Sequence, residues 1–90
     1  MGVTRRVLRW MIPADDQWHE LTTPGPILHV ATRAEAYAEV WALDDPDGHV
    51  MTTRWLRVFG TGQLGVEGEY VGTAITPSRK LVWHVFERRQ

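Results

Sequence analysis

The stretch from residue 39 to residue 62 decides the fold that we expect for this chain. It reads Glu-Val-Trp-Ala-Leu (39–43), Asp-Asp-Pro-Asp-Gly (44–48), His-Val-Met-Thr-Thr-Arg-Trp-Leu-Arg-Val-Phe (49–59) and Gly-Thr-Gly (60–62). The first and third segments are rich in the aromatic and β-branched residues that favour strands. Between them, Pro46 is preset for the second position of a type I turn, and Gly48 suits the fourth position. The pattern predicts a β-hairpin.

Strand signals continue toward the N-terminus. Residues 5–12 alternate between two faces and predict an edge-type strand, which Pro13 ends. Residues 18–22 predict a short second strand, followed by a type II turn with Gly25 at positive φ. Residues 27–31 form a nearly continuous apolar run, which predicts an interior strand.

The segment from residue 32 to residue 43 carries two competing signals. Residues 34–39 have high helix propensity, whereas residues 39–43 have the residues of a strand. A true helix needs about 10 residues and a stop signal. The turn residues that begin at residue 44 leave too little chain before them for both. We therefore expect a polar connection at 33–35, at most one short helical turn, and a strand from about residue 36 to residue 43.

The C-terminal third repeats the same alternation of strands and turns. Gly65 and Gly68 predict a loop, and residues 69–75 predict a strand in which Gly72 marks a bulge or a close backbone approach. Residues 76–80 predict a turn, and residues 81–86 a last, strongly apolar strand.

Seven short segments bounded by Pro, Gly or Asp predict an all-β fold, either a small antiparallel sandwich or a partly closed barrel of about six or seven strands. Ninety residues form one domain, residues 1–90, because two cores of half that size would bury too little surface. The chain has no Cys, which excludes disulfides and thiolate chemistry. No segment approaches 18 apolar residues, so we expect no membrane span and a cytoplasmic protein.

Six blocks of the chain, in the right order, resemble a known family. Its members are small proteins of bacteriophages and prophages, especially those of actinobacteria, and they are carried as a domain of unknown function. The resemblance implies a phage or prophage origin and brings no catalytic residues. The loop at 63–67 departs from the family, whose members tend to carry a proline there. The blocks are Asp-Gln-Trp-His-Glu (16–20), Gly-Pro-Ile-Leu-His-Val-Ala (25–31), Trp-Ala-Leu-Asp-Asp-Pro (41–46), Arg-Val-Phe-Gly-Thr-Gly (57–62), Tyr-Val-Gly-Thr-Ala (70–74) and Leu-Val-Trp-His-Val-Phe-Glu (81–87).

The sequence contains few residues in patterns that suit catalysis or metal binding. The four His lack the local spacings of metal ligands, although His29 and His84 could converge if their strands are neighbours, with His19 or Glu20 completing a site. The Asp residues of the 44–48 turn fail the calcium-loop pattern, because no Glu stands at its twelfth position. The only Ser is Ser78, in a turn. We expect neither an enzyme nor a cofactor.

The Trp and Arg residues are the better clue to function. A core of this size takes two or three Trp, and we assign Trp41 and Trp83 to it, which leaves Trp10, Trp18 and Trp55 partly exposed. Trp and Arg dominate protein interfaces and also stack on nucleotides. The alternative is that Arg side chains cover Trp rings on an ordinary surface. The candidate binding residues are Trp18, His29, Arg54, Trp55, Arg57, Phe59, Gly60, Thr61, Gly62 and His84.

Three functions fit these residues. The first is a non-catalytic binding module for a host or phage protein, or for a small ligand. The second is a nucleotide- or nucleic-acid-binding domain, in which Arg54, Arg57 and a backbone nest at 60–62 hold an anion while Trp55 stacks. The net charge of −1 argues against general affinity for nucleic acid. The third is a structural homodimer formed by the strand at 5–12.

Overall fold

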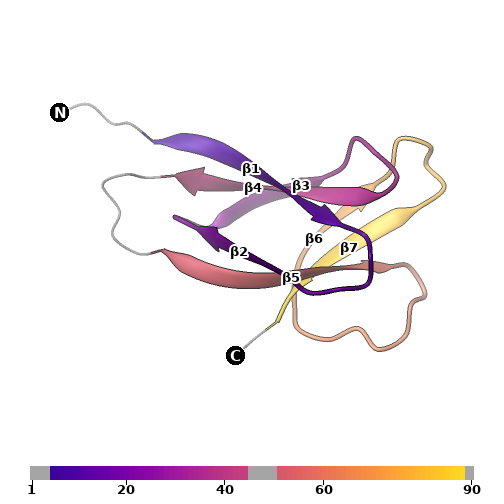
Figure 1. The fold of residues 1–90 in the computed structure, drawn as a ribbon. Helices are drawn as coiled ribbons and strands as arrows, with labels where there is room; N and C mark the ends of the chain where they lie inside the picture. The colour runs from indigo at the N-terminus through magenta and orange to yellow at the C-terminus, as the bar shows by residue number, and fades with distance from the viewer. Residues whose placement is uncertain (1–4, 45–50, 89–90) are drawn as a thin grey trace.

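Two antiparallel sheets face each other in the computed structural model, which describes residues 5–44 and 51–88 (Figure 1). The three-stranded sheet has the order β1-β4-β3, and the four-stranded sheet has the order β2-β5-β7-β6. The strands are β1 (Arg6–Pro13), β2 (His19–Thr23), β3 (Ile27–Ala31), β4 (Tyr37–Asp44), β5 (Thr52–Gly60), β6 (Glu69–Ile75) and β7 (Val82–Glu87). The all-β prediction is confirmed, and the form is a sandwich rather than a closed barrel.

The predicted hairpin is wrong, although both of its strands exist. β4 pairs with β1 and β3, whereas β5 pairs with β2 and β7 in the other sheet. Each strand has an inward apolar row, with Val40 on β4 and Leu56 and Val58 on β5. These rows face each other across the sandwich, so the strands lie in opposite layers. The predicted turn at 45–48 lies outside the described residues.

Two further expectations near the N-terminus are wrong. β3 is an edge strand rather than an interior one, because only β4 pairs with it, and its residues Leu28 and His29 are exposed. The described backbone has positive φ at three glycines, and Gly25 is not one of them. Glycine is required there by space, since a Cβ atom would lie 2.5 Å from the carbonyl oxygen of Leu43.

Other local predictions are confirmed. β1 is an edge strand, and β4 begins at Tyr37 after bends at residues 33–36, with no helical turn in the described residues. Gly65 and Gly68 adopt positive φ in the predicted loop. Gly72 is both a bulge and a close approach, because the register shifts beside it and a Cβ atom would lie 2.5 Å from Cγ2 of Val30.

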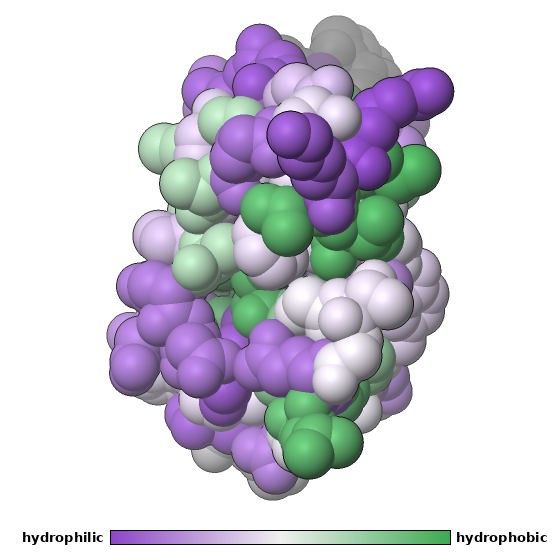
Figure 2. Space-filling model, turned by 90° about the vertical axis from the view of Figure 1, so that its right-hand side faces the viewer, coloured by the Kyte–Doolittle hydropathy of each residue, from purple (hydrophilic) through white to green (hydrophobic). Residues whose placement is uncertain are grey.

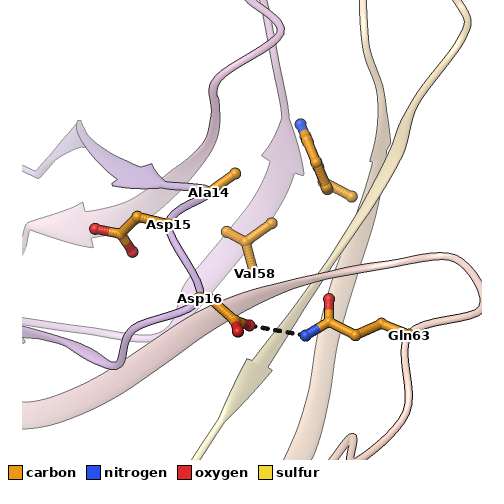
Figure 3. Close-up of a pocket in the computed structure, with 6 residues that line it drawn as sticks. Ala14, Asp15, Asp16, Val58 and Gln63 are labelled. Atoms are coloured by element: carbon orange, nitrogen blue, oxygen red, sulfur yellow. Dashed lines mark hydrogen bonds between the residues drawn. The ribbon is translucent and has the colours of Figure 1, made fainter.

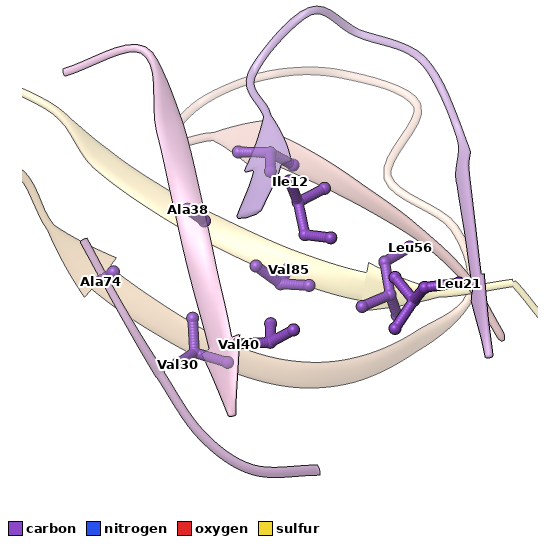
Figure 4. Packing of buried hydrophobic residues seen from close by; sticks show 9 residues of the cluster. Ile12, Leu21, Val30, Ala38, Val40, Leu56, Ala74 and Val85 are labelled. Atoms are coloured by element: carbon purple, nitrogen blue, oxygen red, sulfur yellow. The ribbon is translucent and has the colours of Figure 1, made fainter. Parts of the chain in front are cut away.

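The core lies between the sheets and is built from branched and small side chains (Figure 4). All five Trp are only half-buried. Trp83 packs against this core as expected, and Trp10 does so too. Trp41 does not, because alternation along β4 places it on the outer face, between the inward residues Val40 and Ala42. The buried cluster consists of Ile12, Leu21, Val30, Ala38, Val40, Leu56, Val58, Ala74 and Val85.

Candidate functional site

Most of the predicted binding residues meet on the outer face of the four-stranded sheet. Alternation along β5 sends Leu56 and Val58 into the core and Trp55, Arg57 and Phe59 outward. On the neighbouring strand β7, the register sets Phe86 opposite Arg57 and His84 opposite Phe59. We call this surface the aromatic–arginine face; its members are Trp18, Trp55, Arg57, Phe59, Tyr70, Phe86 and Arg88.

The rings of this face pack edge to face. The ring centroid of Phe59 lies 6.2 Å from that of Trp18 and 5.6 Å from that of Phe86, with interplanar angles of 74° and 90°. Tyr70 extends the row, 5.7 Å from Phe86. Such geometry adds favourable contact to area burial. Phe59 is only 1% exposed although it points away from the main core, so these rings form a second small core.

Both cations of this face are already engaged. The guanidinium carbon of Arg57 lies 4.6 Å from the Phe59 centroid, and an Arg57 N–H donates to Asp16 over 2.6 Å. Hydrogen bonds from Arg57 and then Gln63 lower the pKa of Asp16. Arg88 lies 4.8 Å from the Trp55 centroid. The arrangement matches the alternative in which Arg side chains cover Trp rings.

Arg54 does not join the aromatic–arginine face. It lies three residues before Arg57, so alternation turns it to the opposite side of β5. Its Nε donates to Oγ1 of Thr23 over 2.8 Å, and its NH1 donates to Oε1 of Glu87 over 2.9 Å. Thr23 is buried, so Arg54 closes one end of the core rather than binding from the surface.

The turn at residues 60–62 lies at the polar border of this face. Oγ1 of Thr61 is 2.8 Å from Nε2 of His84, whose Nδ1 is 3.1 Å from Oγ1 of Thr73. Gly62 has φ of 87°, which fits the strand-end explanation of the glycines. The Gly60 amide donates to Oε1 of Gln63 over 2.9 Å, so this N–H is committed within the turn. A nest that offers it to an anion is not formed.

The predicted convergence of His29 and His84 is wrong. His29 belongs to the three-stranded sheet, where its ring centroid lies 5.8 Å from that of Trp41, and His84 belongs to the four-stranded sheet. His19 is also separate, with Nε2 2.7 Å from Oδ1 of Asp15. This contact is the main cause of the lowered pKa of Asp15. Within residues 5–44 and 51–88, no group of three or more His, Asp or Glu could hold a metal ion.

A pocket of about 370 Å³ opens at the end of the sandwich where the β1–β2 and β5–β6 connections meet. Val58 and Trp83 give it apolar walls, and Asp16 and Gln63 are bonded to each other at its rim (Figure 3). The carboxylate of Asp15 points away from Gln63 in that view. This end of the molecule shows separate hydrophobic patches among hydrophilic residues (Figure 2).

The outer face of the three-stranded sheet was missed as a binding surface. Alternation along β1 turns Val7, Arg9 and Met11 outward, and the side chains of Val7 and Met11 stay 54% and 55% exposed. Trp41 of β4 lies between the outer strands, opposite Arg9 and His29 in the register. We call this surface the apolar–basic face; its members are Val7, Arg9, Met11, Glu39 and Trp41, with Arg33 beside them. The signal was present in the sequence, because the alternation of residues 5–12 puts Val7, Arg9 and Met11 on one face, but this row is the less apolar of the two.

A buried carboxylate organises the apolar–basic face. Glu39 is 0% exposed although it points outward from β4, because Arg9 and Arg33 cover it. Arg33 donates to its two carboxylate oxygens over 3.0 and 2.8 Å, and Arg9 NH1 also donates to it. The hydrogen bonds of Arg33, opposed by burial and aided by Arg9, lower the pKa of Glu39. Two guanidinium groups are thereby fixed at the surface.

A family model for a domain of unknown function, DUF7352, matches residues 3–90, nearly the whole chain. The chain belongs to the DUF7352 family. No curated protein and no solved structure matches it.

The two outer faces of this DUF7352 domain differ in how far their side chains are exposed. The part of the chain that the structure describes contains no helix of the length and apolarity needed to cross a membrane. Most rings of the aromatic–arginine face are covered by its own contacts, although Tyr70 stays 58% exposed, whereas the apolar–basic face leaves both Val7 and Met11 in solvent beside fixed cations. The second face is therefore the better candidate site.

Proposed function

We propose that this DUF7352 domain is a non-catalytic binding module that holds a protein partner on its apolar–basic face. The observation that carries the proposal is the exposure of Val7 and Met11, which flank Arg9 in the outward row of β1, on a sheet that also presents Trp41. Apolar side chains that gather on one face of a sheet mark interaction sites. A sheet also holds these groups in fixed positions, which reduces the entropy lost on binding.

The charge of this face supports a partner with acidic groups. Arg9 and Arg33 share a single carboxylate, that of Glu39, and their side chains remain 45% and 67% exposed. Two guanidinium groups with one carboxylate leave a net positive charge. Arg and Trp are also the residue types that contribute most to protein interfaces. A partner surface with carboxylates around an apolar centre complements this arrangement.

The resemblance to phage and prophage proteins supports a cellular location for the proposed binding. In that setting the domain acts in the cytoplasm of the infected cell, and the partner is a host protein or another phage protein. An actinobacterial host is therefore the appropriate cell in which to look for the complex.

The alternative of nucleotide or nucleic-acid binding gains less support. Of the cations it relies on, Arg54 is paired with Glu87 and Arg57 with Asp16. Phosphate binding would have to break both ion pairs. A small anionic ligand at residues 60–62 would likewise compete with Gln63 for the amide of Gly60.

Photo-crosslinking tests the proposal directly. A photoreactive p-benzoylphenylalanine is placed at Met11 on the apolar–basic face, and as a matched control at Ile75, which is equally exposed on the other sheet. After irradiation in an actinobacterial host, we expect a discrete crosslinked protein from position 11 and none from position 75.

Specificity is checked by adding Val7→Asp to the position 11 protein. This change places a carboxylate in the apolar centre of the face but touches no buried residue, so circular dichroism should be unchanged while the crosslinked product is lost. Identical products from both positions, or none from position 11, would contradict the proposal.

A further inference from the structure

The sandwich has four sheet edges, and three of them are interrupted or short. β2 and β3 each have five residues, β3 also contains a register shift, and β6 contains the bulge beside Gly72. β1 differs, because its eight residues pair with β4 without a register shift from Arg6 to Pro13. Among the described strands, none pairs with the other side of β1 (Figure 1).

A regular, unpaired edge is a template for another strand. It presents a row of main-chain N–H and C=O groups, and proteins usually blunt such rows with short strands, bulges, charges or proline. β1 has proline only at its end and no bulge. Its protection therefore rests on charge, since Arg6 and Arg9 are its charged residues and Arg5 precedes them.

This charge selects the kind of strand that can be added. Arg6 forms an ion pair with Asp44 and Arg9 with Glu39, yet the two Arg side chains stay 69% and 45% exposed. Arg5 and Arg33 lie nearby, so this edge carries more positive than negative charge. A second copy of β1 would bring a second set of these cations to the same edge, whereas an acidic segment would neutralise them. The edge is thus protected against its own copy and open to an acidic chain.

We propose that the β1 edge binds an extended acidic segment of the partner protein as an added antiparallel strand. The proposal rests on the proposed function and specifies its mode. Main-chain hydrogen bonds supply affinity, and alternate side chains supply specificity. Carboxylates of the segment lie opposite Arg6 and Arg9, and apolar side chains lie opposite Leu8 and Trp10, which face the interior side of the sheet.

A designed peptide tests this mode without knowledge of the partner. The probe is acetyl-Val-Thr-Val-Glu-Val-Thr-Glu-Glu-amide, whose Glu residues fall opposite Arg9, Arg6 and Arg5 in an antiparallel register. We expect its titration into 15N-labelled protein to shift the β1 amide signals and to slow their hydrogen exchange. The amides of β6, at an edge of the other sheet, should not respond.

Two control peptides separate strand addition from other contacts. Replacing Glu by Lys should abolish binding, because the charges then repel. N-methylation of alternate amides keeps the side chains but removes main-chain donors, and it should also abolish binding. Equal binding of the N-methylated peptide would overturn the inference.

Two variants complete the design. Arg6→Glu should weaken the Glu peptide at least fivefold, and Lys80→Glu, in the turn after β6, should leave its affinity unchanged. A lack of response at β1, or a concentration-dependent dimer formed by the free protein through β1, would overturn strand addition by an acidic segment. The crosslinking at Met11 would still stand in that case, so failure of this mode is distinguishable from failure of the proposed function.

Discussion

The two outer faces of this sandwich are built from similar residues and reach opposite results. On the aromatic–arginine face, Phe59 is covered by Trp18, Phe86 and Arg57. On the apolar–basic face, Trp41 has His29 as its ring neighbour, and Met11 stays in solvent. Arg residues cover rings on the first face, whereas on the second they cover a carboxylate, Glu39.

The two faces differ because the carboxylates that pair with their Arg residues lie in different places. Asp16 reaches Arg57 from the β1–β2 connection, outside the row of rings, so this guanidinium can stay over the aromatic surface. Glu39 lies within its own face and draws Arg9 and Arg33 over itself. The apolar side chains beside it then lack a cover. The first face buries Phe59, and the second face leaves Val7 and Met11 exposed.

The largest expected effect comes from removing the centre of the closed face. Phe59→Ala deletes a ring that is almost fully buried, and losses of this kind cost about 3–5 kcal/mol. Met11→Ala is the matched change on the open face, where exposed substitutions change stability by less than about 0.5 kcal/mol. Urea unfolding followed by circular dichroism measures both. If the two variants unfold at the same urea concentration, the contrast between the faces is wrong.

A second change tests the close contact between the two sheets. Gly72→Ala places a methyl group 2.5 Å from Cγ2 of Val30, between β6 of one sheet and β3 of the other. Overpacking of this kind costs about 1–3 kcal/mol. Adding Val30→Ala removes Cγ2 but keeps Cβ, which lies 2.8 Å from the added methyl group, so the strain should be relieved only in part and the double-mutant cycle should give a favourable coupling energy. Strict additivity would show that the strain arises elsewhere.

The third prediction concerns the carboxylate that keeps the second face open. Glu39→Gln removes a charged acceptor of two guanidinium groups, and hydrogen bonds to charged groups contribute about 1.5–3 kcal/mol. Because the exposed Arg side chains can turn to water, we expect a loss near the lower end. The measurement is urea unfolding at pH 7.

The same variant has a defined pH dependence. The folded pKa of Glu39 is lowered from its ordinary value of 4.5, so its stabilisation is complete above that value and is lost as the pH falls through the folded pKa. The difference in stability between the wild-type protein and Glu39→Gln should therefore shrink below about pH 4.5. Asp15 and Asp16 also have lowered pKa values, but they are present in both proteins and cancel. A difference that is constant down to pH 3 would contradict the assignment.

The sequence predicted where the strands lie better than it predicted which strands pair with one another. Alternation and turn residues located β1, β4 and the loop at Gly65, because these signals are local. Pairing is not local: the residues of β4 and β5 fit a hairpin as well as two facing layers, and only the packing of both inward rows distinguishes these arrangements.

The candidate site shows the same limit in a different form. Arg54 and Arg57 were grouped because they are close in sequence, although an odd separation along a strand sends them to opposite faces. That error was avoidable from periodicity alone. The burial of Glu39 was not predictable, because Arg33 reaches it from a neighbouring connection and Arg9 from another strand.

The smallest predicted effect tests how the closed face holds its cation. Arg57→Lys keeps the charge near Asp16 but replaces a planar group that lies 4.6 Å from the Phe59 centroid and 5.9 Å from the Trp18 centroid. Lysine cannot stack in this way, and the contact of a partly solvated cation with a ring is worth about 0.5–1 kcal/mol; the Arg57 side chain keeps 21% of its surface exposed. Arg79→Lys, in the exposed turn after β6, is the matched control and should have no effect on urea unfolding. Equal stability of Arg57→Lys and the wild-type protein would mean that charge alone holds Arg57, and the rings would then be covered without its contribution.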